Sequence, residues 1–285
     1  MSVVRAAPDL HAAATERDLF EWYRDGSGVV IQHGDYGLAA AGTSGSIPVA
    51  EGPNHVARAA SLAQEALEAT AGTGIVMGAL PFEGSCDAIL RVPERVIRGT
   101  PLHGEAAPQP GWAITALVPD PLPVEYEAAV ERALEAIDAG EVDKVVLART
   151  LMVEADAPID PRLVARRFNA EEPGCFVFLV ALPGGVSSLV GASPEIVIRR
   201  DGLMVSSDPL AGTARRSPDP VRDQEIARQL LDTVKEQREH RLVAEAVADA
   251  MTPFCSNLVV DREASLTSTA TLWHLHTAIR GSLKP

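Results

Sequence analysis

The sequence has few cysteines, and their arrangement argues against several classes of protein. Its 285 residues contain only Cys86, Cys175 and Cys255, and no two of them form a C-x-x-C pair. An odd count without close spacing argues against a disulfide framework and against a zinc knuckle. We therefore expect buried or half-buried thiols in a chain that belongs to a reducing compartment, the cytoplasm.

Positive charge is also scarce. Lys and Arg number 25 against 39 Asp and Glu, which gives a formal net charge of -14 and a pI of about 4.9. Binding to nucleic acid requires basic surface that neutralises phosphates, so we expect no nucleic-acid partner. The acidic surface can simply keep the chain soluble, and an anionic substrate would need local cations, backbone N–H groups or a metal.

Long apolar runs and several signature motifs are absent as well. No stretch approaches the roughly 18 apolar residues that a membrane-spanning helix needs, and residues 1–20 lack the basic start and apolar run of a signal peptide. The sequence contains no G-x-x-x-x-G-K-[ST], G-x-G-x-x-G, H-E-x-x-H or G-x-S-x-G motif. We therefore expect no membrane partner and none of the sites that these motifs mark.

The local patterns that are present predict a mixture of helices and antiparallel strands. Helices are predicted at residues 55–69, 124–139, 161–169 and 220–251, the last with a break near Lys235. Strands are predicted at residues 19–23, 29–33, 74–80, 88–92, 144–153, 175–182, 188–190, 195–200, 203–207, 258–260 and 272–279. Residues 40–46 are predicted to be a loop and residues 99–111 a linker. Because the strands cluster in groups, the predicted fold class is α+β.

Two side chains are candidates for acid–base chemistry. Lys144 opens a predicted strand of mostly apolar residues, and burial would lower the pKa of its amine, which suits a general base. Glu195 follows Pro194 between two predicted strands, and a carboxyl in a closing loop can act as a general acid. Taken alone, each has a simpler interpretation as a solvated residue at the edge of a strand or in a turn.

Glu236 and Glu239 are candidates for binding a divalent cation. They stand three residues apart on a predicted helix and so share one face, while His240 points away from it. Paired carboxylates at this spacing can bind Mg²⁺, with water and a substrate anion as further ligands. The positively charged neighbours Lys235, Arg238 and Arg241 support the alternative of a solvated, salt-bridged face.

A glycine-containing turn and a histidine pair complete the set of candidates. Residues 208–216 are predicted to form a turn in which Gly212 and Thr213 expose backbone N–H groups that can hold a carboxylate. His274 and His276 alternate on a predicted strand and therefore point to one side. No third His or Cys is placed to complete a zinc site, so a hydrogen bond from His274 to a ligand is the favoured interpretation.

Five stretches, taken together in their order and spacing, resemble the chorismate-utilising enzymes, and most closely the isochorismate synthases among them. They are residues 143–150, 191–195, 209–213, 235–243 and 273–275. The resemblance covers roughly residues 74–285. It implies an α+β fold of two packed antiparallel sheets flanked by helices, an active site in a deep cleft, chorismate as substrate, and Mg²⁺ as cofactor.

The resemblance also implies roles for individual residues. Lys144 matches the base that activates water to attack C2 of chorismate, and Glu195 matches the acid that protonates the departing C4 hydroxyl. Glu239 matches a Mg²⁺ ligand, with Glu236 beside it. The implied reaction is the conversion of chorismate to isochorismate for a siderophore or for menaquinone, a choice that the sequence leaves open.

Residue types separate the branches of the family. Gly212 and Thr213 match the turn that contacts the substrate, and His274 matches a residue beside its ring. Ala211 stands in that turn where aminodeoxychorismate synthases carry a nucleophilic lysine, which argues against that branch. Lys144 favours water over ammonia as nucleophile, which argues against an anthranilate synthase. Salicylate synthase, which shares the lysine, remains the alternative within the family.

The resemblance further implies a C-terminal segment beyond residue 285. Family members continue well past the strand at residues 272–279 with a lobe that supplies more carboxylate-binding groups and a second acidic Mg²⁺ ligand. We therefore expect a truncated chain of uncertain activity, and a non-catalytic protein that binds ligand is the alternative from another class. Residues 1–110 are expected to form the variable N-terminal part and residues 111–285 the catalytic part of one continuous, monomeric domain.

Overall fold

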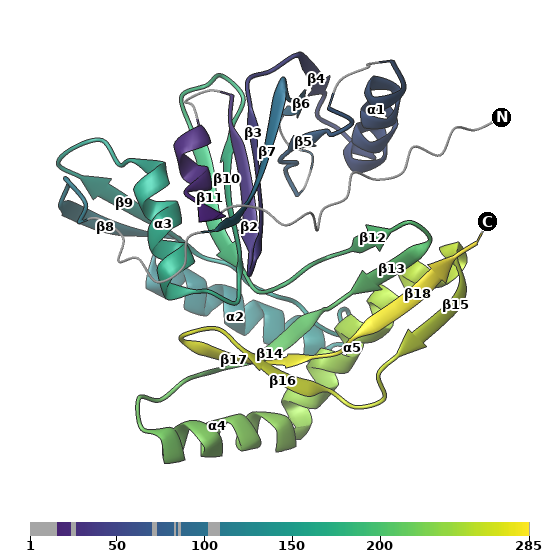
Figure 1. The fold of residues 1–285 in the computed structure, drawn as a ribbon. Helices are drawn as coiled ribbons and strands as arrows, with labels where there is room; N and C mark the ends of the chain where they lie inside the picture. The colour runs from purple at the N-terminus through teal and green to yellow at the C-terminus, as the bar shows by residue number, and fades with distance from the viewer. Residues whose placement is uncertain are drawn as a thin grey trace.

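The computed structural model describes residues 16–23, 27–69, 73–82, 84, 87–101 and 109–284, and it confirms the α+β class. Figure 1 shows two groups of elements. The upper group surrounds the largest sheet, and in the lower group helices α4 (Pro220–Asp232) and α5 (Val234–Met251) lie against several strands. The residues singled out from the sequence lie mostly in the lower group.

Six strands form the largest sheet, in the order β1-β7-β3-β2-β10-β11. Their bounds are β1 Glu16–Arg17, β2 Val29–His33, β3 Tyr36–Ala41, β7 Arg95–Pro101, β10 Phe176–Ala181 and β11 Ser188–Ser193. Neighbours pair antiparallel, except for the parallel pair β1–β7. Strands from both sides of residue 110 share this sheet. We propose on that ground that the two predicted parts of the chain form one continuous domain.

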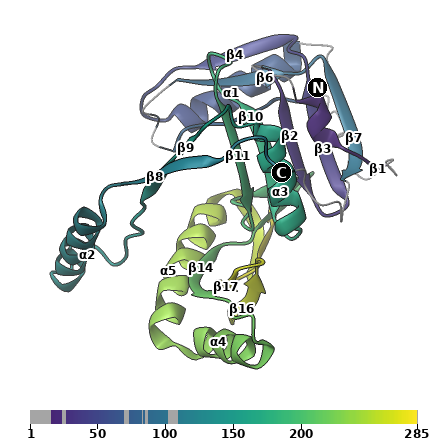
Figure 2. The ribbon, with the colours of Figure 1, turned by 90° about the vertical axis from the view of Figure 1, so that its left-hand side faces the viewer.

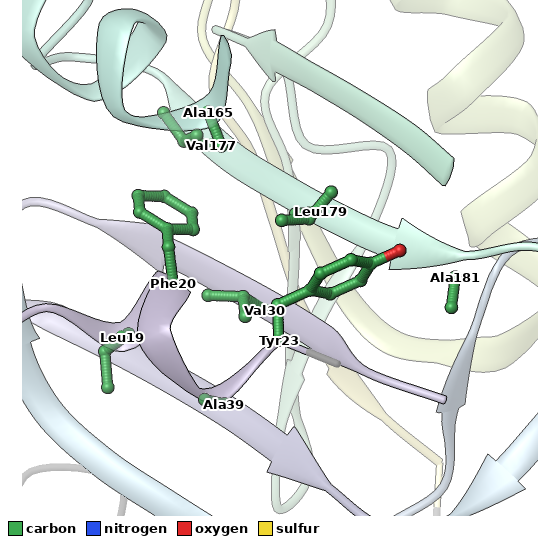
Figure 3. Packing of buried hydrophobic residues seen from close by; sticks show 9 residues of the cluster. All are labelled: Leu19, Phe20, Tyr23, Val30, Ala39, Ala165, Val177, Leu179 and Ala181. Carbon is green, nitrogen blue, oxygen red and sulfur yellow. The ribbon is translucent and has the colours of Figure 1, made fainter. Parts of the chain in front are cut away.

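The main core lies between this sheet, the short 3₁₀ helix η1 (Leu19–Trp22) and helix α3 (Pro161–Glu171). Figure 3 shows Phe20 and Tyr23 beside Val30 of β2 and Leu179 of β10, and these four side chains are at most 2% exposed. The strand predicted at residues 19–23 was wrong. The carboxylate of Asp18 accepts a hydrogen bond from the Phe20 backbone N–H and so caps a helical turn.

A second small sheet has the order β4-β6-β5, and helix α1 (His55–Ala69) packs on it. Its strands are β4 Gly45–Val49, β5 Met77–Gly78 and β6 Ala88–Val92. The predictions for α1 and β6 are confirmed to the residue. The loop predicted at residues 40–46 is present but shorter, because β3 continues to Ala41 and β4 begins at Gly45, which leaves residues 42–44 between the two strands.

Strands β8 (Ile114–Asp120) and β9 (Thr150–Ala155) form a two-stranded ribbon, and helix α2 (Pro123–Asp138) lies between them in the sequence. Figure 2 shows α2 at the end of this ribbon, apart from the two main groups, and none of its residues is buried. The strand predicted from Lys144 begins only at Thr150. Asp120 ends β8 opposite Thr150, so residues 144–149 have no partner strand in the described part of the chain.

The lower group contains two sheets, with the orders β12-β13-β18-β15 and β14-β17-β16. Their strands are β12 Arg199–Asp201, β13 Met204–Ser207, β14 Leu210–Arg215, β15 Cys255–Val260, β16 Ser265–Ser268, β17 Leu272–His276 and β18 Ile279–Leu283, and the 3₁₀ helix η2 (Thr252–Phe254) follows α5. The predicted hairpin around residues 200–202 is confirmed as β12–β13. The predicted helix break falls at Thr233, two residues before Lys235.

The structure bears on the predictions for the cysteines and for membrane-spanning helices. Cys175 and Cys255 are buried free thiols, as predicted, and Cys86 lies outside the described residues. Among the helices of the described part, none is both long and apolar enough to cross a membrane.

Candidate active site

A bulge in strand β14 is the centre of the candidate site. Residues 209–213 do not form the predicted turn, because β14 pairs with β17 in a register that shifts between Ala211 and Thr213. Gly212 occupies the bulge with φ of +81°, a conformation that only glycine adopts at low cost. A Cβ atom at Gly212 would lie 3.2 Å from Oε2 of Glu236 and 3.2 Å from Cδ1 of Leu275. The bulge therefore brings the backbone against the carboxylate of Glu236.

Thr213 and His274 face each other across β14 and β17. The Thr213 hydroxyl and His274 Nδ1 are 3.0 Å apart and share a hydrogen bond. Burial lowers the pKa of His274, and the negative charge of Glu195 opposes this effect. His274 Nε2 is buried and has no hydrogen-bond partner among the described residues. Buried polar atoms without a partner are rare in folded proteins, and a catalytic role is one explanation for them.

The side chain of Glu195 also contacts β14. It follows β11 on a short connection, where its backbone N–H donates to the hydroxyl of Ser193 at 3.3 Å. Its Oε1 accepts a hydrogen bond from the backbone N–H of Leu210 at 3.1 Å. The side chain of Glu195 is thus held at the first residue of β14, beside the bulge.

Lys144 lies in the connection between α2 and β9, where it is half-buried. Its positive charge lowers the pKa of His240 on α5, which places Lys144 within electrostatic range of that helix. Residues 144–149 do not form a strand, so the strand that was predicted to begin at Lys144 was wrong.

Glu236 and Glu239 project from the first turns of α5 toward one positive charge. Lys235 Nζ lies 3.3 Å from Oε1 of Glu236 and 3.1 Å from Oε1 of Glu239. The hydrogen bond to Glu239, followed by that to Glu236, raises the pKa of Lys235. The two carboxylates can therefore approach a single cation. The described residues contain no group of three or more His, Cys, Asp or Glu side chains that could hold a metal ion.

His276 belongs to a separate cluster and does not join His274 in a metal site. Its Nε2 lies 3.1 Å from Oδ1 of Asp208, and its Nδ1 lies 3.1 Å from the hydroxyl of Ser265. Arg280 Nη1 also contacts Oδ1 of Asp208, at 3.3 Å. Through Asp208, this cluster links the connection between β13 and β14 to β16, β17 and β18.

A second hydrogen-bond network, which was not predicted from the sequence, links α4 to β17. Asp223 of α4 accepts hydrogen bonds from Arg216 at 3.1 and 2.8 Å, from the Ser217 backbone at 3.0 Å and from Trp273 Nε1 at 2.9 Å. The hydrogen bonds from Arg216, then that from Ser217, are the main causes that lower the pKa of Asp223 to about 2. The Arg216 guanidinium also lies 4.7 Å from the ring centroid of Trp273. The network holds the residue next to His274.

A cavity along α5 does not coincide with these residues. It has a volume of about 830 Å³ and lies between α5 and the connection from β15 to β16. His240 and Thr277 line it, together with charged residues such as Arg241 and Arg262. None of the residues predicted to bind or convert a ligand lines this cavity. We take the β14 bulge as the site because hydrogen bonds and close contacts join the predicted residues there.

The structure brings most of the predicted site residues together. Contacts at the bulge join residues from β14, β17, α5 and the connection after β11, namely Glu195, Ala211, Gly212, Thr213, Glu236 and His274. Glu239 joins this set through Lys235, whereas Lys144 is linked to the region only by its electrostatic effect on His240. His240, which had been given no role, is buried in the same region.

An α+β fold that gathers acidic, basic and hydrogen-bonding groups around one bulged strand defines a site for a small polar ligand. The chain belongs to the family of chorismate binding enzymes, because the family model with the description "Chorismate binding enzyme" matches residues 103–285.

Relatives and solved structures agree with this membership. The chain is 36% identical over 258 residues to isochorismate synthase DhbC of Bacillus subtilis. The aligned region covers 86% of this chain and 65% of that protein. It is also 36% identical over 213 residues to isochorismate synthase EntC of Escherichia coli K12. This aligned region covers 73% of this chain and 54% of that protein. The crystal structure of DhbC from Bacillus anthracis matches with a TM-score of 0.83 and 32% identity, over 94% of this chain and 70% of the other. The chain thus spans between about half and two thirds of the length of these curated relatives.

Proposed function

We propose that this chain carries the catalytic residues of an isochorismate synthase, an enzyme that converts chorismate to isochorismate. The observation that carries the proposal is the set of contacts at the β14 bulge, which joins Glu195, Glu236 and His274 in a chain of the chorismate binding family. The names of the relatives favour this reaction over the salicylate synthase and anthranilate synthase alternatives.

The proposed reaction exchanges one hydroxyl group for another. Lys144, as the neutral amine, accepts a proton from water while the water oxygen forms a bond to C2 of chorismate. The ring double bond shifts, and the bond between C4 and its hydroxyl oxygen breaks. Glu195, as the protonated acid, donates a proton to that oxygen, which leaves as water. Water is added and water is lost, so the product is an isomer of the substrate.

The residues of α5 fit a magnesium ion as cofactor. Mg²⁺ prefers oxygen ligands, and enzymes often hold it with one or two carboxylates plus water and the substrate. Glu239 would hold the ion with Glu236 beside it, since both carboxylates already turn toward the single positive charge of Lys235. When bound, the ion would neutralise a carboxylate of the substrate. We propose that the N–H groups of the bulge and the side chains of Thr213 and His274 orient that substrate.

Calorimetric titration of the chain with chorismate, with and without Mg²⁺, tests the proposal. We expect binding that requires Mg²⁺ and that weakens more than about ten-fold in Glu239→Gln, since losses of this size follow even from changes beside a metal ligand. Glu245→Gln makes the same charge change on an exposed position of α5 and should bind as the unchanged chain does. Equal binding by both variants would contradict the role of Glu239.

Product analysis by chromatography distinguishes the candidate activities. Isochorismate as the product supports the proposal, whereas salicylate with pyruvate would assign the chain to the salicylate synthases. Tight binding of chorismate by a folded chain that forms no product would favour a non-catalytic protein.

A further inference from the structure

His240 lies at a junction of the lower group and takes no part in the proposed chemistry. The ring is 2% exposed, and its Nε2 lies 2.7 Å from the hydroxyl of Thr277, itself 4% exposed. These two residues are 37 positions apart in the sequence. A hydrogen bond shielded from water in this way is stronger than one at the surface, and losing one partner leaves the other buried and unsatisfied.

Thr277 connects His240 to the strand that carries the bulge. It stands between β17 and β18, and its backbone N–H donates to the carbonyl of Pro209 at 3.4 Å, immediately before β14. Through Thr277, His240 therefore ties α5 to the residue that immediately precedes β14.

The position of α5 decides where its carboxylates lie. Glu236, Glu239 and His240 fall within little more than one helical turn, and a helix moves as a rigid unit over that length. At the bulge, Oε2 of Glu236 would lie 3.2 Å from a Cβ atom on Gly212, so a small shift of the helix would change this approach. The contact between His240 and Thr277 is a buried polar link that resists such a shift.

We propose that His240 is a positioning residue, which together with Thr277 fixes the carboxylates of α5 against the β14 bulge. The inference rests on the proposed function, because it assigns the pair a role in holding the Mg²⁺-binding helix. His240 does not meet the substrate.

The test removes the hydroxyl of Thr277 and leaves all candidate catalytic residues in place. Thr277→Val keeps the shape of the side chain but not the hydrogen bond, and Thr277→Ser restores a hydroxyl. Tyr23→Phe is the matched control, since Tyr23 is 2% exposed and shares a hydroxyl hydrogen bond with Ser188 in the upper group. The control measures the general effect of losing one buried hydroxyl.

The first readout is amide hydrogen exchange by mass spectrometry, which needs no ligand. We expect Thr277→Val to speed exchange in peptides that cover residues 209–213 and 235–241, and Thr277→Ser to restore slow exchange. Tyr23→Phe should leave these peptides unchanged. Faster exchange spread evenly over the chain, or no change in these two segments, would overturn the inference whether or not the chain binds chorismate.

The second readout is the Mg²⁺ concentration that gives half-maximal chorismate binding. We expect Thr277→Val to raise it by about ten-fold, the lower end of what changes behind a metal ligand cause, while affinity at saturating Mg²⁺ stays within about two-fold. An unchanged Mg²⁺ requirement in a chain that binds chorismate would overturn the inference. Absence of binding by the unchanged chain would instead count against the proposed function, and the exchange measurement would decide the role of His240 alone.

Discussion

Replacing Gly212 with alanine tests the geometry of the β14 bulge. Gly212 has φ of +81°, and an alanine there would cost about 1–2 kcal/mol because its Cβ approaches the following carbonyl oxygen. The same Cβ would lie 3.2 Å from Oε2 of Glu236 and from Cδ1 of Leu275, which is 0% exposed. Overpacking against a residue that cannot move adds about 1–3 kcal/mol. We therefore expect Gly212→Ala to destabilise the fold by about 2–5 kcal/mol.

Gly202 offers a matched control for the backbone contribution alone. It has φ of +57° in the turn between β12 and β13, and a Cβ there would meet no atom within 4 Å. Gly202→Ala should cost only the backbone strain of about 1–2 kcal/mol. In thermal unfolding, each kcal/mol lowers the midpoint by about 2–4 °C for a chain of this size, so the two variants should be clearly separated.

The two variants should also differ in ligand binding. An alanine at position 212 displaces the carboxylate of Glu236, so Mg²⁺-dependent chorismate affinity should fall by about ten-fold, as for other changes beside a metal ligand. Gly202→Ala should leave this affinity unchanged. If the two variants lose equal stability and bind chorismate equally, the close approach of Glu236 to the bulge does not matter and the reasoning is refuted.

Three further predictions concern the surroundings of the site. The pKa of Asp223 is lowered to about 2, so its contribution to stability is present above about pH 4 and is lost as the pH falls toward 2. The difference in unfolding midpoint between the unchanged chain and Asp223→Asn should therefore shrink over that range. A constant difference would contradict this prediction. Thr213→Val removes the hydrogen bond to His274 and should weaken chorismate affinity while the unfolding midpoint changes by only a few degrees; unchanged affinity would show that this pair does not orient the substrate. Leu179→Ala empties a site of 0% exposure in the upper group and should cost about 2–5 kcal/mol in urea unfolding, and a loss below about 1 kcal/mol would place Leu179 outside the core.

Local signals in the sequence predicted those elements whose stability depends on local contacts. The helix at residues 55–69 has regular apolar spacing, and it occurs with the predicted bounds. The strand predicted from Lys144 failed at its first six residues, because a strand also needs a partner, and β8 ends opposite Thr150. Residues 19–23 have an apolar composition typical of a strand, but the cap from Asp18 turns them into a 3₁₀ helix.

The site could be predicted only in part, and chiefly through the resemblance to a family. Proline and glycine in residues 209–213 suggested a turn, whereas Gly212 forms a bulge inside a strand paired with β17. Nothing in the local pattern of Glu195 shows that its carboxylate reaches the backbone of Leu210. His240 was set aside because it was taken to point away from the face of Glu236 and Glu239. Its partner Thr277 is distant in the sequence and becomes a neighbour only in the folded chain.

The most direct test of the account is a chorismate turnover assay with Mg²⁺, with products separated by chromatography. It should compare the unchanged chain with Lys144→Ala and with Lys284→Ala, which removes an exposed lysine from the far end of the lower group. We expect the unchanged chain and Lys284→Ala to form isochorismate. We expect Lys144→Ala to fold and to form none. Isochorismate formed at an equal rate by Lys144→Ala, or no isochorismate from the folded, unchanged chain, would contradict the account.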